Sequence, residues 1–163
     1  MDKYLTPALK AYYMQDFAQL LQYKADFWSL DAGLQEVLER INANPQIQTL
    51  YSQRYFPGKT TNPDRSYLRF AYAEQVEQKL FKQIIPELVE RFVASFDTWC
   101  YYGFSYPKDN LVYEAEKGSD APGCLTNPDY FRINQIDLHL ESASLAEHLV
   151  FWETLKEKLG TLG

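Results

Sequence analysis

The sequence predicts a predominantly helical α+β domain with five to six helices and a small antiparallel sheet within residues ~100–141. Up to about residue 100, apolar side chains recur at spacings of three and four, as in amphipathic helices. In the segments 111–116 and 130–141 they alternate with polar side chains instead, as in half-buried strands. A chain of 163 residues can bury one core, so we expect a single globular domain over residues 1–163.

Three helices are expected in the first third of the chain. Thr6-Pro7 has the residue types that cap and begin a helix, and the apolar spacing extends to about Trp28. Asp31 is suited to cap the second helix, which ends before Pro45 because the residue preceding a proline avoids helical geometry. A short third helix is predicted from Pro45 to about Tyr55.

A longer helix is predicted from Asp64 to about Ile84. Pro86 removes one helical hydrogen bond and clashes with the preceding turn, so we expect a kink or a new helix within two residues of it. The apolar spacing then predicts a further helix over residues 87–100.

A last amphipathic helix is expected after Ser144, which is a favourable N-cap residue. Its polar side is expected to carry His148. The predicted inner stripe consists of Leu145, Leu149, Trp152, Leu155 and Leu159.

The two predicted strands differ in regularity. Residues 111–116 alternate without a break, whereas residues 130–141 change parity. Ile133 is apolar at an odd position and Ile136 at an even one. Because side chains alternate strictly along a strand, this change predicts a bulge or break at Asn134-Gln135.

The formal net charge of −6 arises entirely in the C-terminal part of the chain. Residues 1–96 hold 11 acidic and 11 basic side chains, whereas residues 97–163 hold 11 acidic and only 5 basic ones. An acidic surface repels phosphate and anionic lipid and attracts a basic protein. We therefore expect a basic protein partner, with neither nucleic acid nor membrane as a partner. The same charge also serves solubility, which is the simpler explanation.

The chain has the features of a cytoplasmic protein. It contains no apolar run near the about 20 residues that a membrane span needs. Its first residues lack the basic and apolar regions of a signal peptide. Its two cysteines, Cys100 and Cys124, are too few for a disulfide scaffold, and we expect them to be unbridged.

Common catalytic and cofactor-binding motifs are absent from the sequence. The seven glycines fit neither phosphate-binding pattern, and no cysteine or histidine pair has zinc-site spacing, so we expect no cofactor and no metal. Cys100 lies between Trp99 and Tyr101, and apolar surroundings raise the pKa of a thiol. We therefore expect Cys100 to be a buried structural residue rather than a nucleophile.

One constellation has the residue types of an acid/base or metal site. Asp137, His139 and Glu141 alternate on the second predicted strand and share the face opposite its apolar residues. A carboxylate on each side is expected to raise the pKa of His139. Any strand with one solvent-facing side shows the same pattern, and we give that interpretation more weight.

Residues 96–106 form an aromatic run that contains no basic side chain. Without interleaved bases the run does not favour nucleotide stacking. Tyr and Trp are the preferred anchors of protein interfaces, although they also fill cores. We expect one face of the run to be buried and Tyr102 or Tyr106 to be partly exposed.

Together these features favour a small acidic binding protein that inhibits or regulates a basic protein through its C-terminal half. This composition is similar to that of immunity proteins and inhibitors, and it identifies no family. The expected partner-binding residues are Glu114, Glu116, Asp120, Tyr106 and Tyr113. A shared acidic face would bring together Asp109, Glu114, Glu116, Asp120, Asp129, Asp137, Glu141, Glu147 and Glu153. Two alternatives remain: a metal-assisted or acid/base enzyme using Asp137, His139 and Glu141, and a structural homo-oligomeric subunit, a homodimer formed through exposed aromatic residues.

Overall fold

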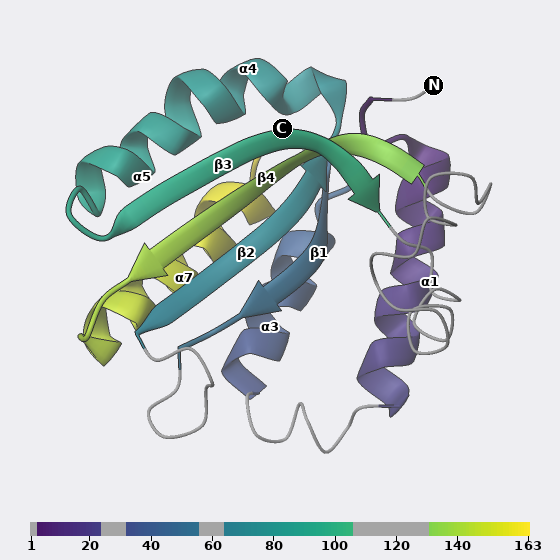
Figure 1. The fold of residues 1–163 in the computed structure, drawn as a ribbon. Coiled ribbons are helices and arrows are strands. Elements are labelled where there is room, and N and C mark those ends of the chain that lie inside the picture. The colour runs from purple at the N-terminus through teal and green to yellow at the C-terminus, as the bar shows by residue number, and fades with distance from the viewer. Residues whose placement is uncertain (1–2, 24–31, 56–63, 106–130) are drawn as a thin grey trace.

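The computed structural model describes residues 3–23, 32–55, 64–105 and 131–163. Figure 1 shows a central sheet with helices behind it and one helix beside it. The helical elements are α1 (Pro7–Tyr23), α3 (Ala32–Asn42), the 3-10 turn η1 (Glu74–Val76), α4 (Glu77–Lys79), the π-helical turn η2 (Leu80–Ile84), α5 (Ile85–Arg91) and α7 (Leu145–Gly160). The strands are β1 (Ile47–Gln53), β2 (Arg65–Tyr72), β3 (Phe96–Ser105) and β4 (Phe131–Glu141).

The four strands form one antiparallel sheet in the order β1-β2-β4-β3. The central strands β2 and β4 pair with Arg69 opposite Asp137, and β3 extends the sheet with Trp99 opposite the same aspartate. The edge strand β1 shifts register between Thr49 and Tyr51. Such a bulge is a common device at sheet edges.

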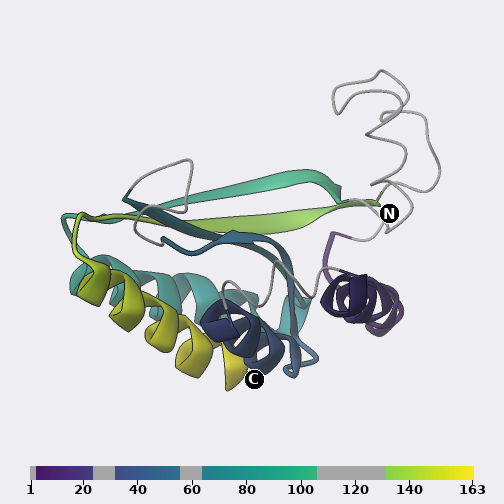
Figure 2. The same ribbon diagram turned by 90° about the horizontal axis from the view of Figure 1, so that it is seen from below.

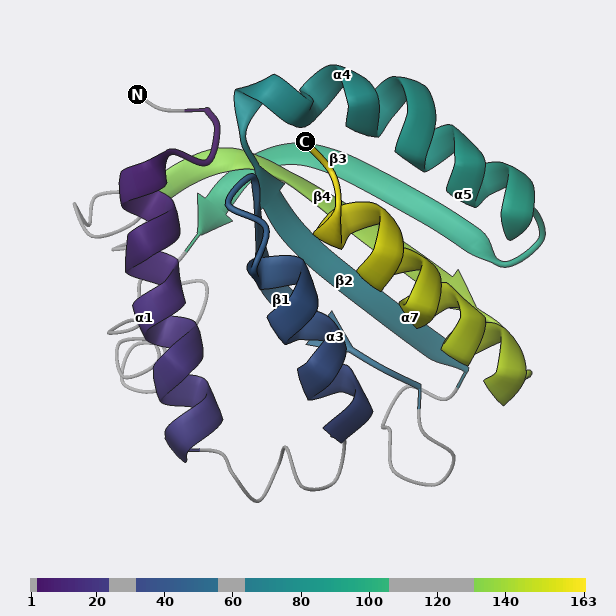
Figure 3. The same cartoon turned by 180° about the vertical axis from the view of Figure 1, so that it is seen from behind.

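Three helical units cover one face of this sheet (Figures 2 and 3). They are α3, α7 and the continuous helical segment from η1 to α5, and their apolar sides meet the even-numbered residues of β2 and β4 in one core. The sheet contributes Leu68, Phe70, Tyr72, Ile136, Leu138 and Leu140 to this core. The structure is therefore a two-layer α+β sandwich over most of the sheet. Among the described residues no helix is long and apolar enough to cross a membrane.

The helix α1 lies apart from the other helices and packs at one end of the sheet (Figure 3). A second, smaller apolar cluster holds it there, made of Leu5, Leu9, Tyr13, Ala71 and Ile133. The backbone of the preceding segment continues the sheet: Leu5 N–H donates to the carbonyl of Tyr72 at 2.9 Å, and Asn134 N–H donates to that of Lys3 at 2.7 Å.

The predicted predominantly helical fold with five to six helices is wrong: the described residues form four helices and a four-stranded sheet. The segments expected to be helical at 45–55 and after residue 64 are β1 and β2, and the expected helix over 87–100 ends at Arg91 before β3. In β2 every second residue from Ser66 onward is buried. Apolar residues at every second position of a strand include pairs that are four residues apart. The same spacing is typical of an amphipathic helix, so the pattern fitted both structures. The predicted strand 111–116 lies outside the described residues.

The predicted irregularity at Asn134-Gln135 is also wrong. β4 pairs with β3 in one unbroken register from Phe131 to Leu140. The parity change arises because different elements cover the two faces: Ile133 contacts the α1 cluster, whereas Ile136 points into the main core.

The predicted cap of α7 is confirmed, and its predicted inner stripe is wrong. The helical segment before Pro86 passes through the π-helical turn η2 and runs directly into α5, with Ile84 and Ile85 both in the right-handed helical conformation, so the helix does not restart at the proline. A kink at Pro86 stays a prediction. Ser144 caps α7, with its hydroxyl accepting from the N–H of Glu147 at 3.2 Å. The inner stripe is different, because Leu145 and Leu149 are exposed. The buried residues of α7 include His148, Phe151, Trp152, Leu155 and Leu159.

His148 belongs to a buried polar network that joins α7 to the sheet. Its Nε2 lies 2.7 Å from the carbonyl oxygen of Ser142, which only accepts, so Nε2 carries the proton. Its Nδ1 therefore accepts from the Ser66 hydroxyl at 2.7 Å. Ser66 Oγ in turn accepts from the N–H of Tyr55 at 2.8 Å. These three hydrogen bonds, buried or partly buried, fix the position of the ring and its tautomer.

Lys10 makes a second buried polar contact, between α1 and the end of α3. Its ammonium donates to the carbonyl of Asn42, the last residue of α3, at 2.8 Å, and to that of Ile47. A cation is favourable at a helix C-terminus. Burial nevertheless lowers the pKa of Lys10 from 10.5 to about 8, because loss of hydration disfavours the charged ammonium.

The network predicts energetic coupling between Ser66 and His148. Ser66→Ala and His148→Leu each leave a buried polar partner unsatisfied and should lower the free energy of unfolding by about 1–3 kcal/mol. The double variant should lose less than the sum of the two, by about 0.5–3 kcal/mol, because the second change removes the orphaned group. Denaturant unfolding of the four proteins measures this, and strictly additive losses would contradict the network.

The lowered pKa of Lys10 predicts that the free energy of unfolding rises at alkaline pH. Between pH 8 and 10.5 the unfolded chain still binds the Lys10 proton while the folded chain has released it, so the free energy of unfolding rises with pH. The increment should be about 2–3 kcal/mol relative to Lys10→Met, measured by denaturant unfolding at both ends of this range. Lys3→Met, at an exposed site, is the control and should keep the increment. Equal pH profiles for wild type and Lys10→Met would contradict this account.

Candidate functional site

The face of the sheet that points away from the helical layer is the candidate site (Figures 1 and 2). Residues directly opposite one another in an antiparallel sheet share a face, and the core takes the even-numbered residues of β2 and β4. The other face, here called the open sheet face, carries Tyr51, Arg65, Tyr67, Arg69, Asp97, Trp99, Asp137, His139 and Glu141. Among the described elements, only α1 packs on residues of this parity, at one end of the sheet.

A bidentate ion pair occupies the middle of the open sheet face. Arg69 Nε and Nη2 donate to the two carboxylate oxygens of Asp137 at 2.7 and 3.1 Å. The Asp137 side chain is only 10% exposed, so its charge depends on this partner. The Arg69 guanidinium also lies 5.2 Å from the ring centroid of Tyr51 on β1, in cation–π range. One row across the sheet thus places an aromatic ring and a carboxylate around a guanidinium.

His139 lies beside this row and is enclosed by aromatic rings. Tyr67 stacks on it at 5.7 Å between centroids, and Trp99 meets it nearly perpendicularly at 4.4 Å. Its Nε2 is 3.8 Å from Asp137 Oδ2, too far for a hydrogen bond, and both ring nitrogens are buried with no hydrogen-bond partner in the described part of the chain. Burial lowers the pKa of His139, outweighing the opposing effect of Asp137. The predicted rise in the His139 pKa is therefore wrong.

Exposed aromatic surface flanks the ion pair on both sides. Trp99 is 49% exposed on β3, and Tyr51 is 41% exposed on β1. Asp97, also exposed on β3, accepts a hydrogen bond from the N–H of Thr98 at 2.8 Å. Large half-exposed rings on a regular sheet are available to an incoming molecule without rearrangement of the backbone.

The charges of the open sheet face balance except at Asp97. Arg69 neutralises Asp137, and Arg65 forms an ion pair with Glu141. No ion pair to Asp97 occurs within the described residues. The five charged side chains of this face therefore sum to −1, with the excess at the Asp97 and Trp99 edge.

The three residues predicted as a catalytic site lie together, but two of them are already in ion pairs and the third is largely enclosed. Asp137 and Glu141 are each paired with an arginine, and the nitrogens of His139 are buried. Proton transfer to a substrate needs an accessible acid or base within hydrogen-bond reach. Within the described residues, no group of three or more His, Cys, Asp or Glu is placed to hold a metal ion.

Four of the nine carboxylates predicted to form an acidic face lie in the described residues. Asp137 and Glu141 lie on the open sheet face, whereas Glu147 and Glu153 lie on α7 in the helical layer. Glu147 accepts from the Ser142 hydroxyl at 2.6 Å, and Glu153 pairs with Lys156 at 2.9 Å. These four carboxylates do not gather on one surface. The other candidates lie outside the described residues, namely Asp109, Glu114, Glu116, Asp120, Asp129, Tyr106 and Tyr113.

Cys100 differs from the prediction of a buried residue. It is a free cysteine and is exposed, because β3 is an edge strand with no neighbour on its outer side in the described sheet. Partial burial of the thiol still raises its pKa, which lowers the fraction of thiolate at neutral pH. Tyr102 is partly exposed as expected, whereas Tyr106 and Cys124 lie outside the described residues.

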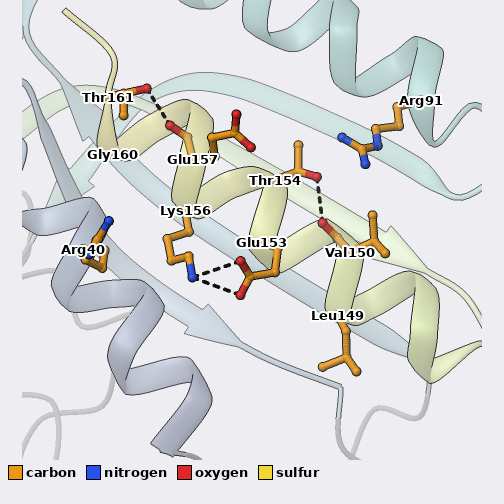
Figure 4. Close-up of a pocket in the computed structure, with 10 residues that line it drawn as sticks. All are labelled: Arg40, Arg91, Leu149, Val150, Glu153, Thr154, Lys156, Glu157, Gly160 and Thr161. Atoms are coloured by element: carbon orange, nitrogen blue, oxygen red, sulfur yellow. Dashed lines mark hydrogen bonds and ion pairs between the residues drawn. The ribbon is translucent and has the colours of Figure 1, made fainter.

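A shallow hollow of about 590 Å³ lies on the opposite, helical side of the molecule (Figure 4). Arg40 of α3 and Arg91 of α5 flank it, and α7 forms its floor. On the floor, Lys156 pairs with Glu153, and the Thr154 hydroxyl donates to the carbonyl of Val150 at 2.7 Å.

Sequence reasoning missed most of the open sheet face. Tyr51, Tyr67 and Arg69 fall in segments that were expected to be helical. The available signal was the alternation in β2, where the odd positions hold Arg65, Tyr67 and Arg69 and the even ones hold core residues. Such alternation is typical of a strand with one apolar face on the core and one polar face toward solvent.

No protein-family model, curated protein or solved structure matches this chain.

The central ion pair predicts unequal effects of removing two carboxylates. Asp137→Ala removes the carboxylate that accepts two hydrogen bonds from the half-buried Arg69 and should lower the free energy of unfolding by about 1–3 kcal/mol. Glu141→Ala is the matched control, because its side chain is 60% exposed, and it should cost less than about 1 kcal/mol. Denaturant unfolding distinguishes the two, and equal losses would contradict a special role for the central pair.

Proposed function

We propose that this protein is a non-catalytic binding protein whose open sheet face docks a protein partner. The observation that carries the proposal is the pair of half-exposed aromatic anchors, Tyr51 and Trp99, on either side of the Arg69–Asp137 ion pair. Trp, Tyr and Arg are the residue types that most often dominate the energy of protein interfaces. Here they lie on three strands of one sheet, with Tyr51 and Trp99 on its two edge strands.

The rigidity of the surface supports the same proposal. Tyr51 and Trp99 project from strands, and each is held by a ring or cation neighbour, Arg69 in one case and His139 in the other. Side chains that are fixed before binding lose less conformational entropy when a partner arrives. The engaged carboxylates Asp137 and Glu141 favour this binding role over the acid/base alternative.

The proposed partner is a basic protein. The chain carries a net charge of −6, and the open sheet face has one uncompensated carboxylate, at Asp97. Opposite charge accelerates association and selects among partners. A binding protein of this kind acts by covering its partner's surface, as an inhibitor or an immunity protein does. The scarcity of cysteines fits action in the cytoplasm.

Differential capture from an extract of the native cell tests this proposal. The immobilised proteins are wild type, Tyr51→Ala, Trp99→Ala and the control Leu149→Ala, which removes an exposed apolar side chain from the opposite, helical side. A partner should be retained by wild type and by the control, and should bind Trp99→Ala at least about tenfold more weakly once purified. Circular dichroism of each variant verifies the fold.

One result of the capture experiment would contradict the proposal. Retention that survives both Tyr51→Ala and Trp99→Ala but is lost with Leu149→Ala would move the interface to the helical side. Light scattering of the purified protein tests the homodimer alternative. A dimer that dissociates in Trp99→Ala would show that the open sheet face binds a second copy instead of another protein.

A further inference from the structure

We infer that Asp97 and Trp99 together form a recognition site for an arginine side chain of the protein partner. This inference rests on the proposed function and specifies the chemistry at one edge of the open sheet face. Asp97 and Trp99 are two residues apart on β3, so their side chains project from the same face about 7 Å apart. They lie opposite His139 and Asp137 in the sheet register.

The centre of the same face already contains a similar arrangement. Arg69 lies 5.2 Å from the ring of Tyr51 while it donates two hydrogen bonds to the carboxylate of Asp137. A ring and a carboxylate therefore bind a guanidinium at the centre of this face. Trp99 and Asp97 repeat these two groups at the edge, with no described arginine or lysine paired to Asp97.

The surroundings leave both groups available to a cation. Trp99 is held by its contact with His139 at 4.4 Å while half of its surface stays exposed. The exposed Asp97 carboxylate has a neutral N–H, that of Thr98, as its hydrogen-bond donor within the described residues. A carboxylate accepts about four hydrogen bonds, so most of its capacity is unused. His139 does not compete for Asp97, because burial keeps its ring neutral at pH 7.

The chemistry selects a guanidinium over other ligands. A planar guanidinium stacks on an indole face and donates two parallel hydrogen bonds to a carboxylate, whereas an ammonium is a compact and strongly hydrated charge. An apolar side chain would cover Asp97 without replacing its water. A phosphate would be repelled by the same carboxylate.

Titration with short peptides tests the inference by NMR. The probe is N-acetylated Gly-Arg-Gly amide, and the matched probe replaces arginine with citrulline, which has nearly the same shape and no charge. The readouts are the indole N–H of Trp99, assigned by its loss in Trp99→Phe, and the backbone N–H of Thr98. We expect saturable shifts with the arginine peptide and at least fivefold weaker binding of the citrulline peptide.

Two variants make the test specific. Asp97→Asn keeps an oxygen acceptor for the Thr98 N–H, so it should fold normally, yet it should weaken the arginine peptide at least fivefold. Glu153→Gln, on α7, removes one negative charge elsewhere and should leave the affinity unchanged. Equal binding of the two peptides, an unchanged affinity in Asp97→Asn, or no saturable shift would each overturn the inference.

Failure of the inference is distinguishable from failure of the proposed function. Asp97→Asn that captures the cellular partner as well as wild type, while Trp99→Ala does not, would refute arginine recognition at Asp97 and leave the docking surface intact. Capture that is insensitive to both Tyr51→Ala and Trp99→Ala would refute the docking surface itself.

Discussion

The ion pair between Arg69 and Asp137 is the interaction on which the open sheet face depends. An antiparallel sheet covered on one side presents alternate residues of each strand to the other side. Asp137 lies in the middle of that side and is nearly buried by its neighbours, where an unpaired carboxylate would be costly. Pairing with Arg69 satisfies it, positions the guanidinium over Tyr51, and removes the carboxylate from acid/base chemistry. Trp99 and Tyr51 remain half-exposed on this face, beside the exposed charged side chains of Asp97 and Glu141, and this combination supports the proposed binding role.

Local signals in the sequence were enough for part of the fold. The helix that begins near residue 32 and the cap at Ser144 follow from residues close to one another in the chain. The strand β2 could not be distinguished from a helix, because Leu68 and Tyr72 fit both periods. Partner strands decide such a case, and β4 lies more than 60 residues away in the sequence. The apolar side chain of Ile133 indicated a bulge because one buried face of the strand was assumed. In the structure α1 covers the other face at that end of the sheet.

The sequence was enough to predict which residues of β4 share a face, but not their ion pairs or pKa shifts. Alternation alone put Asp137, His139 and Glu141 on one face. Their properties depend on β2 and β3, which supply two arginines and the rings of Tyr67 and Trp99. Those neighbours lie opposite in the register, so the pKa of His139 is lowered by burial where sequence proximity predicted a rise.

The central claim is that the open sheet face, and not the helical side, meets the partner. Hydroxyl-radical footprinting of the protein alone and in complex with its captured partner measures this directly, because the oxidation rate of a side chain follows its exposure to solvent. Trp99 and Tyr51, both half-exposed in the free protein, should become protected, while Leu145 and Leu149 on α7 keep their rates. Protection of the two α7 leucines with unchanged oxidation of Trp99 and Tyr51 would contradict the account.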